Sequence, residues 1–283
     1  MAVGERKASR VFLYLFVAMI LVVTLFPFYW IINMSLQNNI ELYDVPPHFY
    51  PPQPTLDNFR SVLFEERGLM KFYEAVFNTL SVAGITMVVC VMLGSITGYA
   101  LARLNFKWGI YFLFALIGTQ MIPPLIDLIP LYIIFSRWLK IIDTKMALVL
   151  GYTGWLLPIS VWILYGYFQT IPKDLESAAR IDGCTRMQAL FRVVMPLSAP
   201  GIAATAIFVF ISSTNEFLFA MVFSSTRRSK TVPVALSDMI GKYSIRYGDM
   251  TAGAVIAALF PVVLALIFQK YLVKSLTAGG IKG

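Results

Sequence analysis

The sequence is poor in charged side chains. Of its 283 residues, 13% are Asp, Glu, Lys or Arg and 58% are hydrophobic, whereas a soluble domain carries about 25% charged residues. With a mean hydropathy of +0.74, the chain has too little polar surface to cover a globule of this size. The composition excludes a cytosolic enzyme, a disordered tail and a disulfide-rich secreted domain. It predicts a protein whose main solvent is lipid.

Other residue types are scarce or absent. Cys90 and Cys184 fall in separate predicted segments, so no disulfide is expected. His48 lacks the companions that a metal site requires. The sequence contains no G-x-x-x-x-G-K-[ST] phosphate loop, so this chain is expected neither to hydrolyse ATP nor to bind a cofactor of its own. The energy for any transport must come from another chain or from an ion gradient.

Long runs without charge define six predicted membrane-spanning helices, because charged groups are costly in hydrocarbon and a span needs about 20 apolar residues. The runs contain two acidic residues, Asp127 and Glu216. The predicted fold class is therefore an all-α integral membrane protein, with a single transmembrane domain over residues 1–283. The predicted spans are residues 11–34, 75–102, 108–136, 146–172, 200–224 and 250–269.

The distribution of basic residues predicts the orientation. Arg6, Lys7 and Arg10 precede the first span, and the next basic residue is Arg60, which favours a cytoplasmic N-terminus. Six spans then place the C-terminus in the cytoplasm as well. The net charge of +8 is expected to meet anionic lipid headgroups and not nucleic acid. The outer loops, residues 35–74, 137–145 and 225–249, either dock an external partner or connect spans passively.

The inner segment, residues 170–200, has the signals of two short helices. Pro172 suits a first helical turn, and Glu176 and Arg180 are spaced for an ion pair along one helix. Gly183 follows as a helix stop that tolerates positive φ. These features predict a helix that ends at a sharp glycine turn.

A second short helix is predicted to follow the glycine turn. Thr185 and Gln188 have the spacing of a capping box. Apolar residues then recur on one predicted stripe, at Met187, Leu190, Phe191 and Val194. Two readings remain open: an amphipathic helix lying on the bilayer surface, or a protrusion that fits a groove of a cytoplasmic partner.

This segment resembles the EAA loop of bacterial ABC-importer permeases, whose pattern is Glu-Ala-Ala, three residues, Gly and later Leu-Pro. Ser177 occupies the position of the motif's Glu, with Glu176 directly before it, and Met195 replaces the usual Leu. The matching residues are Ser177-Ala178-Ala179, Gly183 and Met195-Pro196.

Further stretches resemble the maltose-type carbohydrate importers, and within them the MalG-like subunit. One signature departs from the family, because Thr214 stands where Trp is usual. The resembling stretches, in order, are Gly98-Tyr99-Ala100-Leu101-Ala102-Arg103, Met121-Ile122-Pro123, Ile129-Pro130-Leu131-Tyr132, Asp143-Thr144, Pro196 to Gly201, Asn215 to Ala220, and the tail Leu276 to Gly283.

The resemblance implies a transport subunit that is not itself an enzyme. It would lie in the prokaryotic inner membrane and translocate a sugar or oligosaccharide. Its partners would be a second, MalF-like permease in a heterodimer, two copies of an ABC ATPase that bind ATP and Mg²⁺, and an extracytoplasmic solute-binding protein. The EAA loop would be the coupling helix that contacts the ATPase, through Glu176, Ser177, Ala178, Ala179, Asp182, Gly183, Arg186, Met187 and Phe191.

Three rival functions are considered. Related permeases import glycerol-phosphate or acidic saccharides. An ion-coupled secondary transporter would use Asp127 and Glu216 as proton or cation sites. A membrane scaffold would transport nothing.

Polar residues inside the predicted spans are candidates for the substrate pathway. They either line an outward vestibule for a hydroxyl-rich substrate or form hydrogen bonds between helices. Gln120 precedes Asp127 by seven residues, which predicts roughly the same helix face. The candidates are Asn78, Gln120, Asp127, Asn215 and Glu216.

Proline and glycine predict two local features of the spans. Pro123, Pro124 and Pro130 should kink the third span, because each lacks an amide donor. Gly94 and Gly98 should allow close helix approach in the second span.

Overall fold

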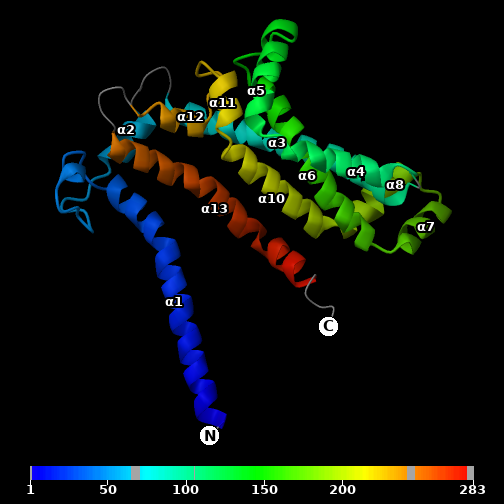
Figure 1. The fold of residues 1–283 in the computed structure, drawn as a ribbon, viewed down its shortest axis with the longest axis horizontal. Helices are drawn as coiled ribbons and strands as arrows, with labels where there is room; N and C mark the ends of the chain where they lie inside the picture. Colours follow the sequence, from blue (N-terminus) through cyan, green and yellow to red (C-terminus); the bar gives the residue numbers. More distant parts are fainter. Residues whose placement is uncertain (1, 65–70, 105, 241–245, 279–283) are drawn as a thin grey trace. The chain divides into compact units, whose positions relative to one another are not determined.

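The computed structural model describes residues 2–64, 71–104, 106–240 and 246–278, and these form helices and their connections, as the predicted fold class requires (Figure 1). The tail residues Gly279 to Gly283 lie outside these ranges. The chain divides into two compact units, Met1–Arg67 with Leu236–Ala258, and Gly68–Ala235 with Leu259–Gly283.

The first unit contains α1 (Ala2–Ser35), the 3-10 turn η1 (Glu41–Tyr43), α2 (Asp57–Phe64) and the start of α13 (Tyr247–Ala278). Asn58 connects α2 to the end of α1. Its side-chain amide donates to the Ser35 carbonyl at 2.9 Å and to the Gln37 carbonyl at 2.8 Å. An apolar window of 18 residues within Phe12–Ser35 of α1 has no buried residue, although Asn33 and Ser35 at the end of the helix are buried. Such a helix is suited to contact with lipid or with another chain.

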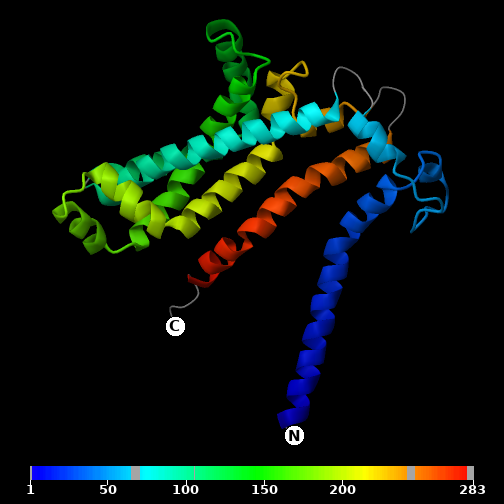
Figure 2. The same cartoon turned by 180° about the vertical axis from the view of Figure 1, so that it is seen from behind.

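The second unit is built on a bundle of α3 (Phe72–Arg103), α6 (Lys145–Thr170) and α10 (Ala199–Thr214), which lie side by side (Figure 2). The predicted role of the glycines in the second span is confirmed. A Cβ atom at Gly98 would lie 3.0 Å from the backbone nitrogen of Tyr165, and one at Gly94 would lie 3.2 Å from the Leu164 side chain. Small residues on α3 therefore set its close approach to α6.

The predicted third span is sharply bent. Gly109–Met121 and Pro124–Trp138 meet at 93°, because Pro123 is extended (ψ 131°) and Pro124 starts a new helix. The kink predicted from the prolines is thus confirmed, but the expectation of one helix over 108–136 is wrong. The pieces are α4 (Gly109–Gly118), the 3-10 turn η2 (Thr119–Met121), α5 (Pro124–Ile133) and the π turn η3 (Ile134–Trp138).

The predicted fifth span is also interrupted. α10 ends at Thr214 and α11 (Leu218–Phe223) begins after a break of three residues. At the other end, Arg186–Leu197 meets Ala199–Thr214 at 83°. The helix expected over 200–224 is therefore two helices, and the short α12 (Val232–Ser237) follows α11.

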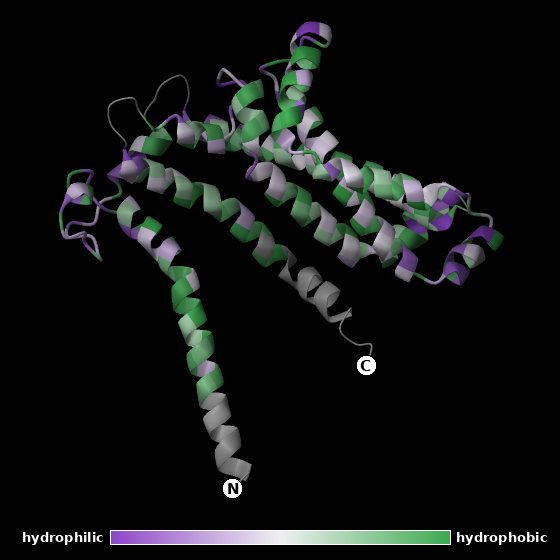
Figure 3. Cartoon of the chain, viewed as in Figure 1, coloured by the Kyte–Doolittle hydropathy of each residue, from purple (hydrophilic) through white to green (hydrophobic). Residues whose placement is uncertain are grey.

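In the described part of the chain, four helices are long and apolar enough to cross a bilayer, and there are up to six spans if each bent pair counts as one. The six-span arrangement stays a prediction. Figure 3 shows α3, α6 and α10 as mainly hydrophobic, whereas hydrophilic residues gather around α7 (Lys173–Ile181).

Candidate functional site

The helical pair at residues 172–198, here called the α7–α8 module, follows α6 directly. It contains α7, α8 (Arg186–Ala189), the π turn η4 (Leu190–Val194) and α9 (Met195–Leu197). α7 ends as its sequence predicts: Gly183 has φ +91°, and the amide of Cys184 donates to the Ala179 carbonyl at 3.0 Å. Bonds of this kind satisfy the last carbonyls of a helix. The glycine turn is thus confirmed.

The start of α8 is fixed by the predicted capping box. The Thr185 amide donates to Gln188 Oε1 at 2.8 Å, and the Gln188 amide donates to Thr185 Oγ1 at 3.3 Å. Both ends of the turn between α7 and α8 are therefore closed by hydrogen bonds, so that the module keeps a defined bend.

The predicted apolar stripe divides into two faces. Leu190 and Val194 are fully buried in a cluster with Tyr99, Leu164, Phe168 and Ile171. Met187 and Phe191 are 47% and 41% exposed, so the expectation of one continuous stripe is wrong. The π turn η4 has a wider hydrogen-bonding pattern than an α-helix, and the 3.6-residue period does not describe this segment. One face of the module packs on the bundle and the other is open.

Glu176 joins the module to α3. Its Oε1 accepts a hydrogen bond from the Tyr99 hydroxyl at 2.6 Å, and its Oε2 lies 3.4 Å from Arg103 Nε. The predicted pairing of Glu176 with Arg180 is therefore wrong, because the carboxylate turns toward α3 while Arg180 is exposed. Ser177, at the position of the motif's Glu, points outward and donates to the Lys173 carbonyl at 3.1 Å.

The remaining predicted coupling residues lie mostly on the open face. Glu176 and Ala179 are half-buried. The exposed ones are Ser177, Ala178, Asp182, Gly183, Arg186, Met187 and Phe191. Three further apolar residues of the module are exposed that the sequence patterns did not single out: Leu175, Ile181 and Leu197. The roles of Tyr99 and Arg103 were not predicted either. Tyr99 and Arg103 are four residues apart in one of the stretches that resemble the family, and this spacing places both side chains on the same face of a helix.

Two of the predicted pathway residues are engaged in structural hydrogen bonds. Asn78 donates to the carbonyls of Arg227 and Lys230 at 2.9 and 3.0 Å. Glu216 is buried, and its carboxylate accepts the amides of Phe219 and Ala220 at 3.0 and 3.2 Å. It therefore caps α11 at the break that divides the predicted fifth span.

The other three pathway candidates are not brought together on one helix face. Gln120 donates to the Trp155 carbonyl at 2.7 Å, and the 93° bend separates it from Asp127. The expectation that Gln120 and Asp127 share a face is wrong, because it assumed an unbroken helix. Asp127 and Asn215 are exposed. A pathway role for these side chains stays a prediction.

The loop at residues 225–230 is fixed by Asp143, at the opposite end of the bundle from the module. Asp143 Oδ1 accepts the amides of Ser225 and Thr226 at 2.8 and 2.9 Å and the Ser229 hydroxyl at 2.8 Å. Burial alone would raise the pKa of Asp143, but hydrogen bonds from Thr226, Ser225 and Ser229 outweigh it and lower the pKa to about 2. The carboxylate therefore stays ionised at neutral pH and keeps its loop in place.

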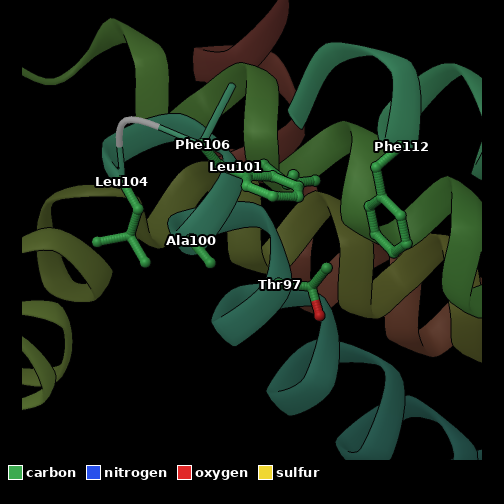
Figure 4. Close-up of a pocket in the computed structure, with 6 residues that line it drawn as sticks. All are labelled: Thr97, Ala100, Leu101, Leu104, Phe106 and Phe112. Carbon is green, nitrogen blue, oxygen red and sulfur yellow. The ribbon is translucent and has the colours of Figure 1, made fainter. Parts of the chain in front are cut away.

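A cavity of about 540 Å³ lies beside the C-terminal end of α3 (Figure 4). Its lining supplies a single hydroxyl, from Thr97, and is otherwise apolar among the described residues. A site for a hydroxyl-rich ligand needs several convergent polar groups, so this cavity is not the candidate site. The lining residues are Thr97, Ala100, Leu101, Leu104, Phe106 and Phe112.

The chain is similar to known transport proteins over a region that includes the α7–α8 module. A family model described as a binding-protein-dependent transport system inner membrane component matches residues 90–278. The trehalose/maltose transport system permease protein MalG of Thermococcus litoralis is 35% identical over 280 residues, covering 99% of each chain. The sulfoquinovosyl glycerol transport system permease protein SmoH of Agrobacterium fabrum is 37% identical over 266 residues, covering 94% of this chain and 92% of that protein.

A solved structure shares the fold. A bacterial ABC transporter involved in the import of the acidic polysaccharide alginate has a chain that matches with a TM-score of 0.79 at 19% identity. The match covers 94% of this chain and 97% of that chain. The helical architecture is therefore shared over nearly the whole length.

Proposed function

We infer the function of this chain from its family, since it belongs to the binding-protein-dependent transport system inner membrane components. It is a multi-pass membrane protein and a permease subunit of an ABC importer for a sugar or oligosaccharide. Relatives that are 35% and 37% identical over nearly the whole chain are named as permeases for trehalose or maltose and for sulfoquinovosyl glycerol.

The proposed mechanism assigns the α7–α8 module to coupling. The observation that carries it is a module with closed turns whose buried face packs on the bundle, while Met187 and Phe191 stay exposed on the other face. Such a surface suits a groove of another protein. ATP would be hydrolysed by that protein, an ABC ATPase present in two copies, and the module would follow its movement.

Transport then proceeds by alternating access. The helices would rock between inward-open and outward-open arrangements as the ATPase pair closes and opens. This works if the nucleotide state changes how the ATPase holds the module, because a partner shifts a conformational equilibrium by its differential binding to the two states. Glu176 is turned away from the open face, so we assign the ATPase contact to Met187, Phe191 and their exposed neighbours.

We propose three partners and an orientation for the complex. A second, MalF-like permease would complete the translocation path as a heterodimer, and a solute-binding protein would deliver substrate outside, in keeping with the family description. Both termini would lie in the cytoplasm, as the basic residues before the first span predict. The module would then face the ATPase in the cytoplasm.

An acidic saccharide is the second candidate substrate. The names of one relative and of the structural neighbour refer to sulfoquinovosyl glycerol and alginate, and both of these compounds are anionic. Uptake of a labelled neutral saccharide (trehalose or maltose) and of a labelled acidic saccharide, each measured with the reconstituted complex, separates the two candidates. Uptake of the acidic saccharide alone would favour the second.

Replacing Phe191 with alanine is expected to weaken binding of the ATPase. The exposed ring is the largest apolar group on the open face, and an aromatic hot-spot residue at an interface contributes about 2 kcal/mol, or roughly 30-fold in affinity. The measurement is co-purification of the ATPase with the permease. Phe114→Ala, which removes an exposed ring from α4, is the matched control and should leave co-purification unchanged. Equal binding by both variants would contradict the assignment of the open face.

A further inference from the structure

The α7–α8 module is connected to the spans by a network of side chains as well as by the peptide chain. Arg103, in the last turn of α3, donates from Nη2 to the Ile171 carbonyl at 2.7 Å. That carbonyl lies at the C-terminal cap of α6, where helix carbonyls lack partners of their own. Arg103 also pairs with Glu176 of α7. The guanidinium of Arg103 therefore connects α3 both to the C-terminal end of α6 and to α7 of the module.

The ion pair is shielded from water. The side chains of Arg103 and Glu176 are 3% and 13% exposed, and Tyr99 is 4% exposed. Exposed ion pairs contribute little because water and salt screen them, whereas breaking a buried pair leaves a charge without compensation. Loss of this shielded ion pair is therefore expected to weaken the connection between α3 and α7, here called the joint.

The Tyr99 hydroxyl lies where α7 and α8 meet. It donates to Glu176 Oε1 at 2.6 Å, and the carbonyl of Arg186, the first residue of α8, lies 3.4 Å away. The short bond to a carboxylate is of the strong, charge-assisted kind. A hydroxyl has one proton to donate, so the bond to Glu176 dominates while α8 stays within reach. This oxygen of α3 therefore bonds to α7 and lies close to the first residue of α8.

We propose that Tyr99 and Arg103 are positioning residues that transmit movement of the α7–α8 module into the span α3. The proposal rests on the proposed function, because it needs an ATPase that moves the module. If the joint is loosened, the module can still bind and follow the ATPase, but α3 no longer follows the module. Hydrolysis then continues without matching transport.

Tyr99→Phe tests the joint with the smallest change. It removes the hydroxyl and keeps the ring, which packs edge-on against Phe168 at 6.5 Å between centroids. The complete importer is reconstituted in liposomes, and sugar uptake and ATP hydrolysis are measured together. Tyr111→Phe, which alters an exposed tyrosine of α4, is the matched control.

The expected result is a loss of coupling. Tyr99→Phe should assemble with the ATPase and keep substrate-stimulated hydrolysis, while the sugar transported per ATP falls about 10-fold, as for loss of a hydrogen bond to a charged group. Glu176→Gln should give a fall at least as large, because its carbonyl can still accept from Tyr99 but the buried charge of Arg103 is left unpaired. The effects of the two substitutions should not add when combined.

Two results would overturn the proposal. One is an unchanged ratio of sugar to ATP in Tyr99→Phe. The other is failure of Tyr99→Phe to assemble while Glu176→Gln keeps the ratio, which would give the tyrosine a merely structural role. Failure of the proposed function is told apart by the wild-type complex, which would then show no ATP-dependent uptake at all.

Discussion

Replacing Gly183 with valine is expected to reduce ATP-dependent uptake about 10-fold or more, because a residue with a side chain pays about 1–2 kcal/mol in left-handed backbone conformations. Gly183 has φ +91°, and a Cβ there would meet no atom within 4 Å. The cost is therefore backbone strain at the bend between α7 and α8. Uptake by vesicles that contain equal amounts of permease is the measurement.

Asparagine at the same position is the matched control. Asn tolerates positive φ better than β-branched residues do, so Gly183→Asn should keep most of the uptake. Both variants should remain in the membrane, since the spans are not altered. Full uptake by Gly183→Val would show that the bend is not needed for coupling.

Replacing Gly201 with alanine is expected to destabilise the permease by about 1–3 kcal/mol, as overpacking does in a well-packed core. A Cβ at Gly201 would collide with the ring of Tyr167, so the ring or one of the helices α6 and α10 must shift. Elsewhere in a helix, glycine to alanine is normally stabilising, by about 0.5–1 kcal/mol. The sign of the effect is thus reversed by the local packing.

Gly154→Ala on α6 provides the comparison, because a Cβ there meets no atom within 4 Å. The thermal midpoint of the detergent-purified permease is measured for both variants by loss of the monodisperse peak on heating. The midpoint should fall for Gly201→Ala and stay or rise for Gly154→Ala. A Gly201→Ala variant as stable as the wild type would refute the close packing of α10 on Tyr167.

Local sequence patterns predicted the parts of the structure that local forces decide. The positive φ of Gly183 and the capping box of Thr185 and Gln188 are set by bonds between residues at most five apart. The apolar runs likewise marked long helices at α1, α3, α6 and α13. The glycine turn and the capping box depend on bonds within one short segment, and the long helices depend on contact between apolar side chains and lipid.

The errors arose where a helix was assumed to continue. The bend of 93° between Met121 and Pro124 separates Gln120 from Asp127, and the π turn Leu190–Val194 interrupts the stripe that includes Phe191. Prolines indicate that a helix is disturbed, but the angle of the bend depends on packing with other segments.

The partners of Glu176 were mispredicted for a different reason: the spacing of Tyr99 and Arg103 marks them as neighbours on one helix face but does not show what they bind. Tyr99 and Glu176 are 77 positions apart, and local spacing offered Arg180 as a partner for the carboxylate. The buried pairing with Arg103 wins because it removes the carboxylate from competition with water and adds the Tyr99 bond. Long-range pairing of this kind requires the fold.

The central claim is that this chain moves substrate with energy that arrives from a separate ATPase through the α7–α8 module. The most direct test is uptake into proteoliposomes that contain the complete importer, compared with liposomes from which the ATPase alone is omitted. We predict accumulation of sugar above its external concentration with ATP in the first case and none in the second. Accumulation without the ATPase, or accumulation abolished by ionophores instead of by ATP removal, would contradict the account.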